Sequence, residues 1–131
     1  MIGTAEIYKV LFASSVIKNL VSKTGTGATT KYKIASCVKE PDTWLASDTT
    51  ISIYQSGPNS LGEVYDVFHT VNCRAPTESK AKELAVEVAR ELHRVTFHQV
   101  FFYCTIEQVL VPADNTDSFN SPVTVRVMGT K

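Results

Sequence analysis

The 131-residue sequence has no excess charge of either sign, because thirteen lysine and arginine residues balance thirteen aspartate and glutamate residues. Proteins that bind nucleic acid without sequence preference use a positive field to neutralise phosphates. The charge balance therefore argues against a free-standing DNA-binding role. It also leaves little electrostatic repulsion between copies, which favours self-association.

Long apolar runs are absent as well. No stretch approaches the roughly 18 apolar residues that a membrane-spanning helix requires. The segment from Met1 to Glu6 has neither the basic region nor the small-residue cleavage site of a secretory signal peptide. We therefore expect a soluble protein that has no membrane partner and is not exported by the general secretory route.

Cysteine is scarce, with only Cys37, Cys73 and Cys104 in the chain. An odd number of widely spaced cysteines fits neither a disulfide framework nor paired Cys-x-x-Cys metal motifs. We expect three reduced, partly buried thiols in a cytosolic chain, since an unpaired cysteine behaves as a small hydrophobic residue.

The residues that are present suffice for a folded core. Apolar residues make up 44% of the chain and charged residues 20%, a composition that is typical of globular proteins and not of disorder. The length fits one domain, residues 1–131, and no repeat or linker divides it.

The first half of the sequence predicts a helix followed by strands. Apolar residues between Thr4 and Val21 recur at spacings of three and four, which predicts a helix with Thr4 as its N-cap. Residues 23–30 contain glycines and hydroxyl residues that predict a loop. A period of two then predicts three strands, within residues 31–39, 51–54 and 63–73.

The clearest element lies between Thr77 and Arg94, where apolar residues form one stripe of a helix. The oppositely charged pairs Glu78–Lys82 and Glu87–Arg90 lie at helical spacing elsewhere on its surface. The stripe consists of Ala81, Leu84, Ala85, Val88 and Leu92.

Two further strands are predicted, at residues 97–111 and 122–128. A strand of fifteen residues would be about 50 Å long, so it either bends at a bulge or forms a hairpin arm with residues 112–118 at its tip. Together the elements predict an α+β fold. Its mostly antiparallel sheet has about five strands and is covered by two helices, in the order α-β-β-β-α-β-β, with an extended C-terminal hairpin.

Side chains that carry common enzyme chemistry do not converge in this sequence. His69 and Cys73 are four residues apart, which on a strand separates them by about 13 Å, too far to share a metal ion. The segment Gly25-Thr-Gly27 lacks the Gly-Lys-Ser/Thr that would complete a phosphate loop, and Asp114 and Asp117 are expected in a solvated turn. We therefore predict no enzymatic activity, no metal site and no cofactor.

A protein that acts through contacts would use its turns and loops. Trp44 lies in a predicted connection, where it either covers the core as a lid or anchors a subunit contact. The other interface candidates lie in the turn 55–62 and the loop 112–118, and they are Pro58, Asn59, Asp114, Asn115 and Asp117.

The order of four consecutive segments indicates a family. These segments are residues 51–57 (ISIYQSG), 64–76 (VYDVFHTVNCRAP), 77–92 (TESKAKELAVEVAREL) and the long strand after them. This pattern resembles the tail terminator and minor capsid (tail-completion) proteins of long-tailed bacteriophages. The resemblance implies a non-enzymatic virion protein, assembled in the host cytoplasm, that forms a homo-oligomeric ring at the head-proximal end of the tail tube.

The resemblance also implies partners. The ring, typically a hexamer, would stop polymerisation of the tail tube protein and offer a docking surface to the head-completion protein. DNA would pass through its lumen without sequence-specific binding. Two alternatives are another neck component, such as a head-completion or connector protein, and a small α+β ligand-binding or enzymatic domain that uses the face of Tyr65, His69 and Cys73.

Overall fold

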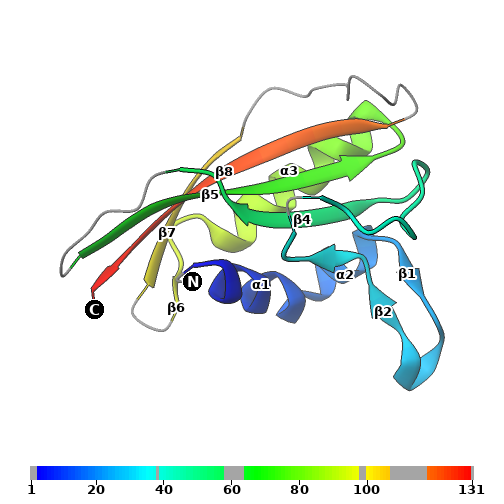
Figure 1. Ribbon diagram of the computed structural model, residues 1–131, viewed down its shortest axis with the longest axis horizontal. Helices are drawn as coiled ribbons and strands as arrows, with labels where there is room; N and C mark the ends of the chain where they lie inside the picture. The colour runs from blue at the N-terminus through cyan, green and yellow to red at the C-terminus, as the bar shows by residue number, and fades with distance from the viewer. Residues whose placement is uncertain (1–2, 38, 58–63, 98–99, 107–117, 131) are drawn as a thin grey trace.

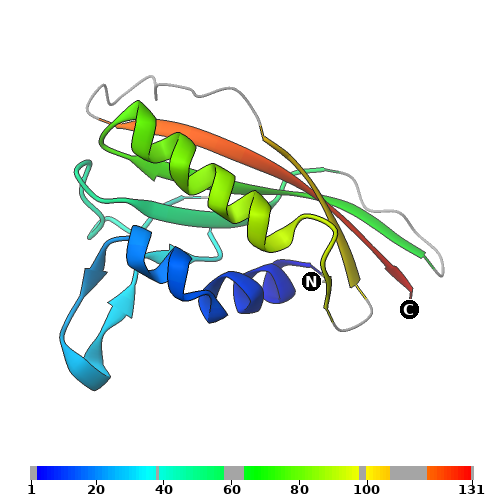
Figure 2. The ribbon, with the colours of Figure 1, turned by 180° about the vertical axis from the view of Figure 1, so that it is seen from behind.

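The computed structural model describes residues 3–37, 39–57, 64–97, 100–106 and 118–130. In these residues a six-stranded curved sheet, in the order β3-β4-β5-β8-β7-β6, is covered on one face by three helices (Figures 1 and 2). The sheet consists of β3 (Ile34–Ala35), β4 (Thr50–Gln55), β5 (Val64–Ala75), β6 (Thr96–Phe97), β7 (Val100–Ile106) and β8 (Phe119–Thr130). The helices are α1 (Thr4–Ala13), α2 (Ser15–Leu20) and α3 (Glu78–Leu92).

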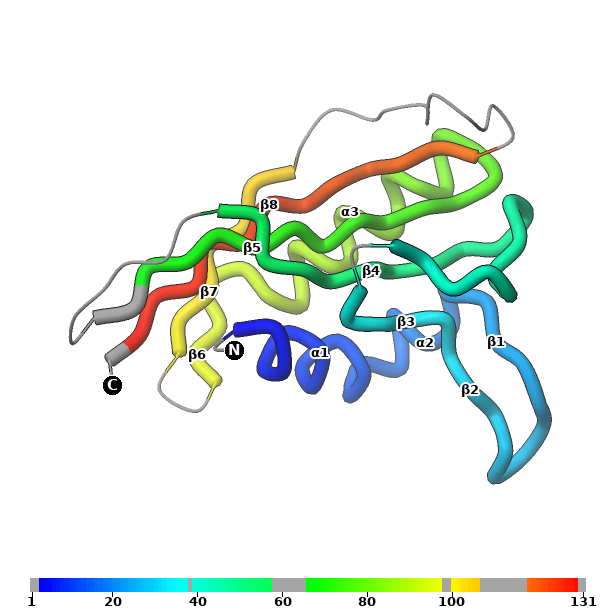
Figure 3. Tube along the Cα trace, in the orientation of Figure 1, coloured from blue at the N-terminus to red at the C-terminus, as the bar shows by residue number. Residues whose placement is uncertain are grey.

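A second, smaller sheet is a hairpin of β1 (Lys23–Thr24) and β2 (Lys31–Tyr32). A short 3₁₀ turn, η1 (Gly27–Thr29), lies between these two strands. The hairpin projects from the body of the protein below the β3 edge of the large sheet (Figure 3). It corresponds to the predicted glycine-rich loop, which is therefore more ordered than its composition indicated.

The predicted N-terminal helix is interrupted at Ser14. This residue is extended (φ −83°, ψ 120°), and its hydroxyl oxygen accepts a hydrogen bond from the Ile17 N–H at 3.3 Å, which starts α2. Serine is a good N-cap, so the interruption follows from the residue at that position. The N-cap of α1 is Gly3 rather than the predicted Thr4, and the Gly3 N–H donates to Glu6 Oε2 at 3.0 Å.

The predicted strand at 31–39 is split into two short strands, β2 and β3. The β3 strand pairs with β4 in parallel, whereas β4–β5, β5–β8, β7–β8 and β6–β7 are antiparallel. The mostly antiparallel character is thus confirmed in part, and the predicted order and number of elements are only partly matched. The strands predicted at 51–54 and 63–73 are confirmed as β4 and β5.

The helix predicted at 77–94 is confirmed as α3, and Thr77 is its N-cap, because its hydroxyl oxygen accepts from the Lys80 N–H at 3.3 Å. All five residues of the predicted apolar stripe are buried. The predicted surface pairs form, with 3.2 Å between Lys82 Nζ and Glu78 Oε1 and a contact between Arg90 and Glu87. Local periodicity was sufficient to define this helix.

The predicted strand of fifteen residues is not continuous. Phe97 belongs to β6, which turns back on the start of β7, and β7 pairs with β8 from Val100 opposite Gly129 to Ile106 opposite Val123. Residues 107–111 lie outside the described residues. The long strands are instead β5 and β8, twelve residues each, which pair along their whole length.

The core lies between the sheet and the helices. Val123, Val125 and Val127 of β8 are fully buried and alternate with partly exposed residues, as predicted for one face of this strand. The helix α3 packs on β5, β7 and β8, whereas α1 packs on β4 and on α3. In the described residues no helix is long and apolar enough to cross a membrane.

Candidate assembly surfaces

The structure describes one of the six predicted interface residues, Trp44. It is half-buried and lies outside the set of described side chains that pack on the hydrophobic core. The other five candidates, Pro58, Asn59, Asp114, Asn115 and Asp117, lie outside the described residues.

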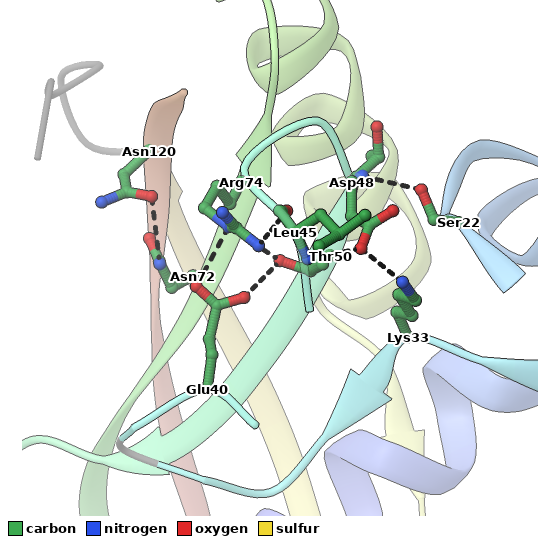
Figure 4. A network of polar contacts seen from close by, with 10 residues as sticks. Ser22, Lys33, Glu40, Leu45, Asp48, Thr50, Asn72, Arg74 and Asn120 are labelled. Atoms are coloured by element: carbon green, nitrogen blue, oxygen red, sulfur yellow. Dashed lines mark hydrogen bonds and ion pairs between the residues drawn. The ribbon is translucent and has the colours of Figure 1, made fainter. Parts of the chain in front are cut away.

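A buried polar network holds the segment that carries Trp44 against the sheet (Figure 4). Arg74 on β5 is 7% exposed, and its Nε lies 3.0 Å from Glu40 Oε1. The same guanidinium donates from Nη2 to the Leu45 carbonyl oxygen at 3.0 Å and from Nε to Thr50 Oγ1 at 3.4 Å. Because Thr50 Oγ1 also donates to Glu40 Oε2 at 2.8 Å, one arginine fixes both ends of residues 40–50.

A second ion pair extends this network toward the hairpin. Lys33 Nζ is paired with Asp48 Oδ2, which also accepts from the Leu45 N–H at 2.7 Å. Burial disfavours the charged form of Asp48, but the hydrogen bonds from Lys33 and Leu45 outweigh it and lower its pKa below the usual value. The carboxylate therefore stays ionised and holds Lys33 in place.

A hollow of about 400 Å³ lies between the hairpin and this segment. Trp44 and Tyr32 contribute its aromatic surface, and Lys31 and Lys33 contribute ammonium groups. Its remaining lining comes from Thr24 and Thr43. The side chains that line this hollow carry ammonium, hydroxyl and indole N–H groups, and Asp42 precedes the lining residue Thr43 in the chain.

A larger, more open hollow of about 500 Å³ lies between α3 and β7. Val86 and Ile106 on its two sides are 42% and 46% exposed, and neighbouring Tyr103 is 45% exposed. Exposed apolar side chains that gather at one place are typical of contact surfaces. The hollow is lined by Val86, Ala89, Arg90, His93, Cys104 and Ile106.

The same hollow borders an open strand edge. The short β6 pairs only with Val100 and Phe101, so in the described residues β7 is the outer strand of the sheet from Tyr103 to Ile106. His93 covers part of this edge, because the Cys104 N–H donates to His93 Nδ1 at 3.0 Å. Unpaired strand edges are sites where another chain adds a strand.

Sequence reasoning did not find this surface. His93 contacts β7 through its Nδ1 atom, which accepts from the Cys104 N–H, and its ring packs edge-to-face on Tyr103 with 4.7 Å between ring centroids. The apolar residues of 100–106 are the sequence feature that could have indicated this surface, because Ile106 continues the inward-facing positions of β7 past the point where the core ends. Only the tertiary structure shows which of these side chains the helix covers.

The face proposed for a ligand-binding or enzymatic site is filled by the protein's own core. His69 is fully buried, with Nε2 2.9 Å from Thr4 Oγ1, and Cys73 is fully buried in the hydrophobic cluster. A Cβ atom on Gly3 would lie 2.7 Å from His69 Cε1, so α1 sits directly on this histidine. The structure does not describe the side chain of Tyr65.

The three cysteines are unpaired, as predicted, with Cys73 buried and the other two half-buried. Burial raises the pKa of all three thiols above the usual value, which keeps them protonated. In the described part of the chain, no group of three or more histidine, cysteine or acidic side chains is arranged to hold a metal ion.

Comparisons with known proteins give a fold relationship. No protein-family model matches the sequence, and no curated protein matches it. A solved structure described as "Virion of native gene transfer agent (GTA) particle" contains a chain that superposes with a TM-score of 0.59 at 18% sequence identity. The match covers 98% of this chain and 95% of that chain, so the two share a fold over nearly their whole lengths.

Proposed function

We propose that this protein is a structural component of a virion and acts by assembling with copies of itself and with other virion proteins. The observation that carries this proposal is the fold shared with a chain of a gene transfer agent virion particle. The exposed apolar hollow beside an open strand edge supports it, because an assembly protein needs such a surface. In this proposal the protein has no enzymatic activity and works through shape.

Within this class we propose the role of a tail terminator. Copies form a closed ring, typically a hexamer, at the head-proximal end of the tail tube, and the ring ends tube growth and receives the head-completion protein. A closed ring needs a heterologous contact, in which two different surfaces of one copy meet, repeated around an axis. The β7 edge and the opposite, β3 end of the sheet supply two such surfaces on one chain.

A neck component such as a head-completion or connector protein fits the same fold relationship. The two roles differ in the partner that each ring binds. A terminator binds the end of the tail tube, whereas a connector binds the portal side.

The test combines assembly with partner choice. We expect the purified protein to form closed rings in electron microscopy, to shorten tubes when it is added to polymerising tail tube protein, and to be captured by tube protein rather than by portal protein. Capture by portal alone would replace the terminator role with the connector role. A protein that stays monomeric at high concentration and with both partners would overturn the virion role.

A further inference from the structure

The zero net charge of this protein conceals a strong segregation of charge along the chain. Residues 7–39 contain six lysines and no aspartate or glutamate. The rest of the chain carries seven basic and thirteen acidic side chains. The zero net charge of the chain therefore does not exclude nucleic-acid contact by this segment, because phosphate binding depends on the local electrostatic field.

The fold places the basic segment along the β3 side of the sheet. Residues 7–39 form α1, α2, the β1–β2 hairpin and β3, the strand at one edge of the sheet. Lys23 and Lys31 are exposed on the hairpin, and Lys9 is exposed on α1. Lys18 lies beside them, with Nζ 4.3 Å from the centroid of the Phe12 ring and 5.3 Å from that of Tyr32. Lys33 and Lys39 differ from these, because Asp48 pairs with Lys33 and Asp42 pairs with Lys39.

The hairpin itself has a composition suited to phosphate. From Lys23 to Lys31 it reads Lys-Thr-Gly-Thr-Gly-Ala-Thr-Thr-Lys, and residues 23–29 are all exposed. Its turn is closed by a hydrogen bond from the Thr26 N–H to Thr29 Oγ1 at 3.3 Å and one from that hydroxyl to the Thr26 carbonyl oxygen at 2.8 Å. Gly25 has φ 81°, and a Cβ atom there would lie 2.4 Å from the Thr29 carbonyl oxygen, so glycine is required for this shape.

The hollow beside the hairpin continues the same chemistry. Lys31, Thr24 and Thr43 line it together with Trp44. Ammonium and hydroxyl groups are the donors that proteins use on the nucleic-acid backbone, where contacts hold the protein in place without reading sequence. An indole N–H adds one more donor.

Other partners fit this surface less well. The centres of protein interfaces are rich in aromatic residues, methionine and arginine and poor in lysine. The hairpin residues 22–31 contain none of the former, and the aromatic side chains of the hollow, Tyr32 and Trp44, stand beside two lysines. Insertion into a lipid surface needs large apolar side chains at the tip, and the only apolar side chain between Ser22 and Lys31 is that of Ala28. A regular array of phosphates remains as the partner with matching chemistry.

We propose that the β1–β2 hairpin and the hollow beside it contact the phosphate backbone of double-stranded DNA without sequence preference. This inference rests on the proposed function in one respect, because a virion component meets packaged DNA. Lys18, Lys23 and Lys31 allow about two to three phosphate contacts per copy, which predicts a log–log salt slope of about −2 to −3. Binding of this kind is weak and fast to release, so DNA still slides past the protein.

The test is fluorescence anisotropy with two labelled duplexes of unrelated sequence, measured from about 25 to 200 mM NaCl. We expect equal binding of both duplexes and loss of affinity with salt. The K23Q/K31Q variant should bind roughly tenfold more weakly, with a salt slope smaller by about two. The matched control is K80Q/K82Q, which removes two exposed lysines of α3 and should bind like the wild-type protein.

Absence of binding at the lowest salt concentration, or an equal loss in the control variant, would overturn the inference. So would a strong preference for one duplex. Mass photometry of the same samples reports the ring independently. Rings that do not bind DNA contradict only this inference, whereas DNA binding by a protein that never forms rings contradicts only the proposed function.

Discussion

Arg74 shows how one buried residue positions a whole segment. Its guanidinium contacts Glu40, Thr50 and the Leu45 carbonyl oxygen, and through them it holds the segment that carries Trp44 (Figure 4). A charge buried in this way is costly unless every partner is present, so removal of one partner is expected to be strongly destabilising. The exposed pair of Arg126 and Asp66 on the open face of the sheet offers a contrast, because water screens it.

We therefore expect R74A to lower the free energy of unfolding by about 3 kcal/mol. The matched control is R126A, which removes an arginine from the exposed ion pair with Asp66. This variant should leave the urea midpoint nearly unchanged. Urea unfolding followed by tryptophan fluorescence measures both, and Trp44, the single tryptophan, lies in the segment that R74A releases. Equal losses in the two variants would contradict the structural role of Arg74.

Among the helices and strands, the start of α1 contacts β5 through one histidine, His69. His69 is buried beneath the start of α1, with Nε2 2.9 Å from Thr4 Oγ1. Burial lowers the pKa of His69 below its ordinary value of 6.5, and the nearby Glu6 carboxylate opposes this in part. At a pH between the lowered pKa of the folded protein and the ordinary pKa of the unfolded chain, His69 is protonated in the unfolded chain and neutral in the folded protein.

Stability should therefore fall as the pH decreases through about 6.5, because the proton binds to the unfolded chain. The variant H69Q keeps a nitrogen near Thr4 but cannot titrate in this range. We expect H69Q to lose less stability than the wild-type protein between about pH 7.5 and 5.5. Urea midpoints of both proteins at both pH values measure this difference, and parallel losses would show that another group causes the acid sensitivity.

At the scale of the whole molecule, two surfaces of different chemistry lie at different ends of the sheet. The hairpin of β1 and β2 lies beyond β3, and β7 lies toward the other edge of the sheet (Figures 1 and 2). The apolar hollow lies between α3 and the open edge of β7. Different surfaces on one chain are what a heterologous contact requires, whereas a two-fold dimer uses one surface twice. This arrangement agrees with the proposed ring, in which each copy meets two neighbours through two faces.

If the hollow at β7 is the subunit contact, V86S/I106S should shift the protein from rings to monomers. Both side chains are more than two-fifths exposed in the single chain, so the unfolding midpoint of the monomer should change little. The matched control L45S removes another exposed apolar side chain, 61% exposed, outside the hollow, and should assemble normally. Sedimentation velocity measures the distribution, and rings in V86S/I106S would rule out this surface.

Elements whose signal is local were predictable from the amino-acid sequence. The stripe of α3 and the alternation in β4, β5 and β8 each depend on neighbours within a few residues, and the structure confirms them. The unpaired cysteines were predictable for the same reason, because spacing alone excludes common disulfide and metal patterns. Even the break at Ser14 follows from a local capping preference, although the apolar periodicity concealed it.

How these elements pack on one another could not be predicted from local patterns. Three contacts join residues that are distant in the sequence. They are the parallel pairing of β3 with β4, the contact of His93 with β7 and the ion pair of Arg74 with Glu40. No periodicity encodes such contacts, because they depend on which faces of the sheet and helices are left to be covered. The same holds for charge: the composition is neutral, whereas residues 7–39 contain six lysines and no acidic residue, and the fold places their hairpin and β3 on one side of the sheet.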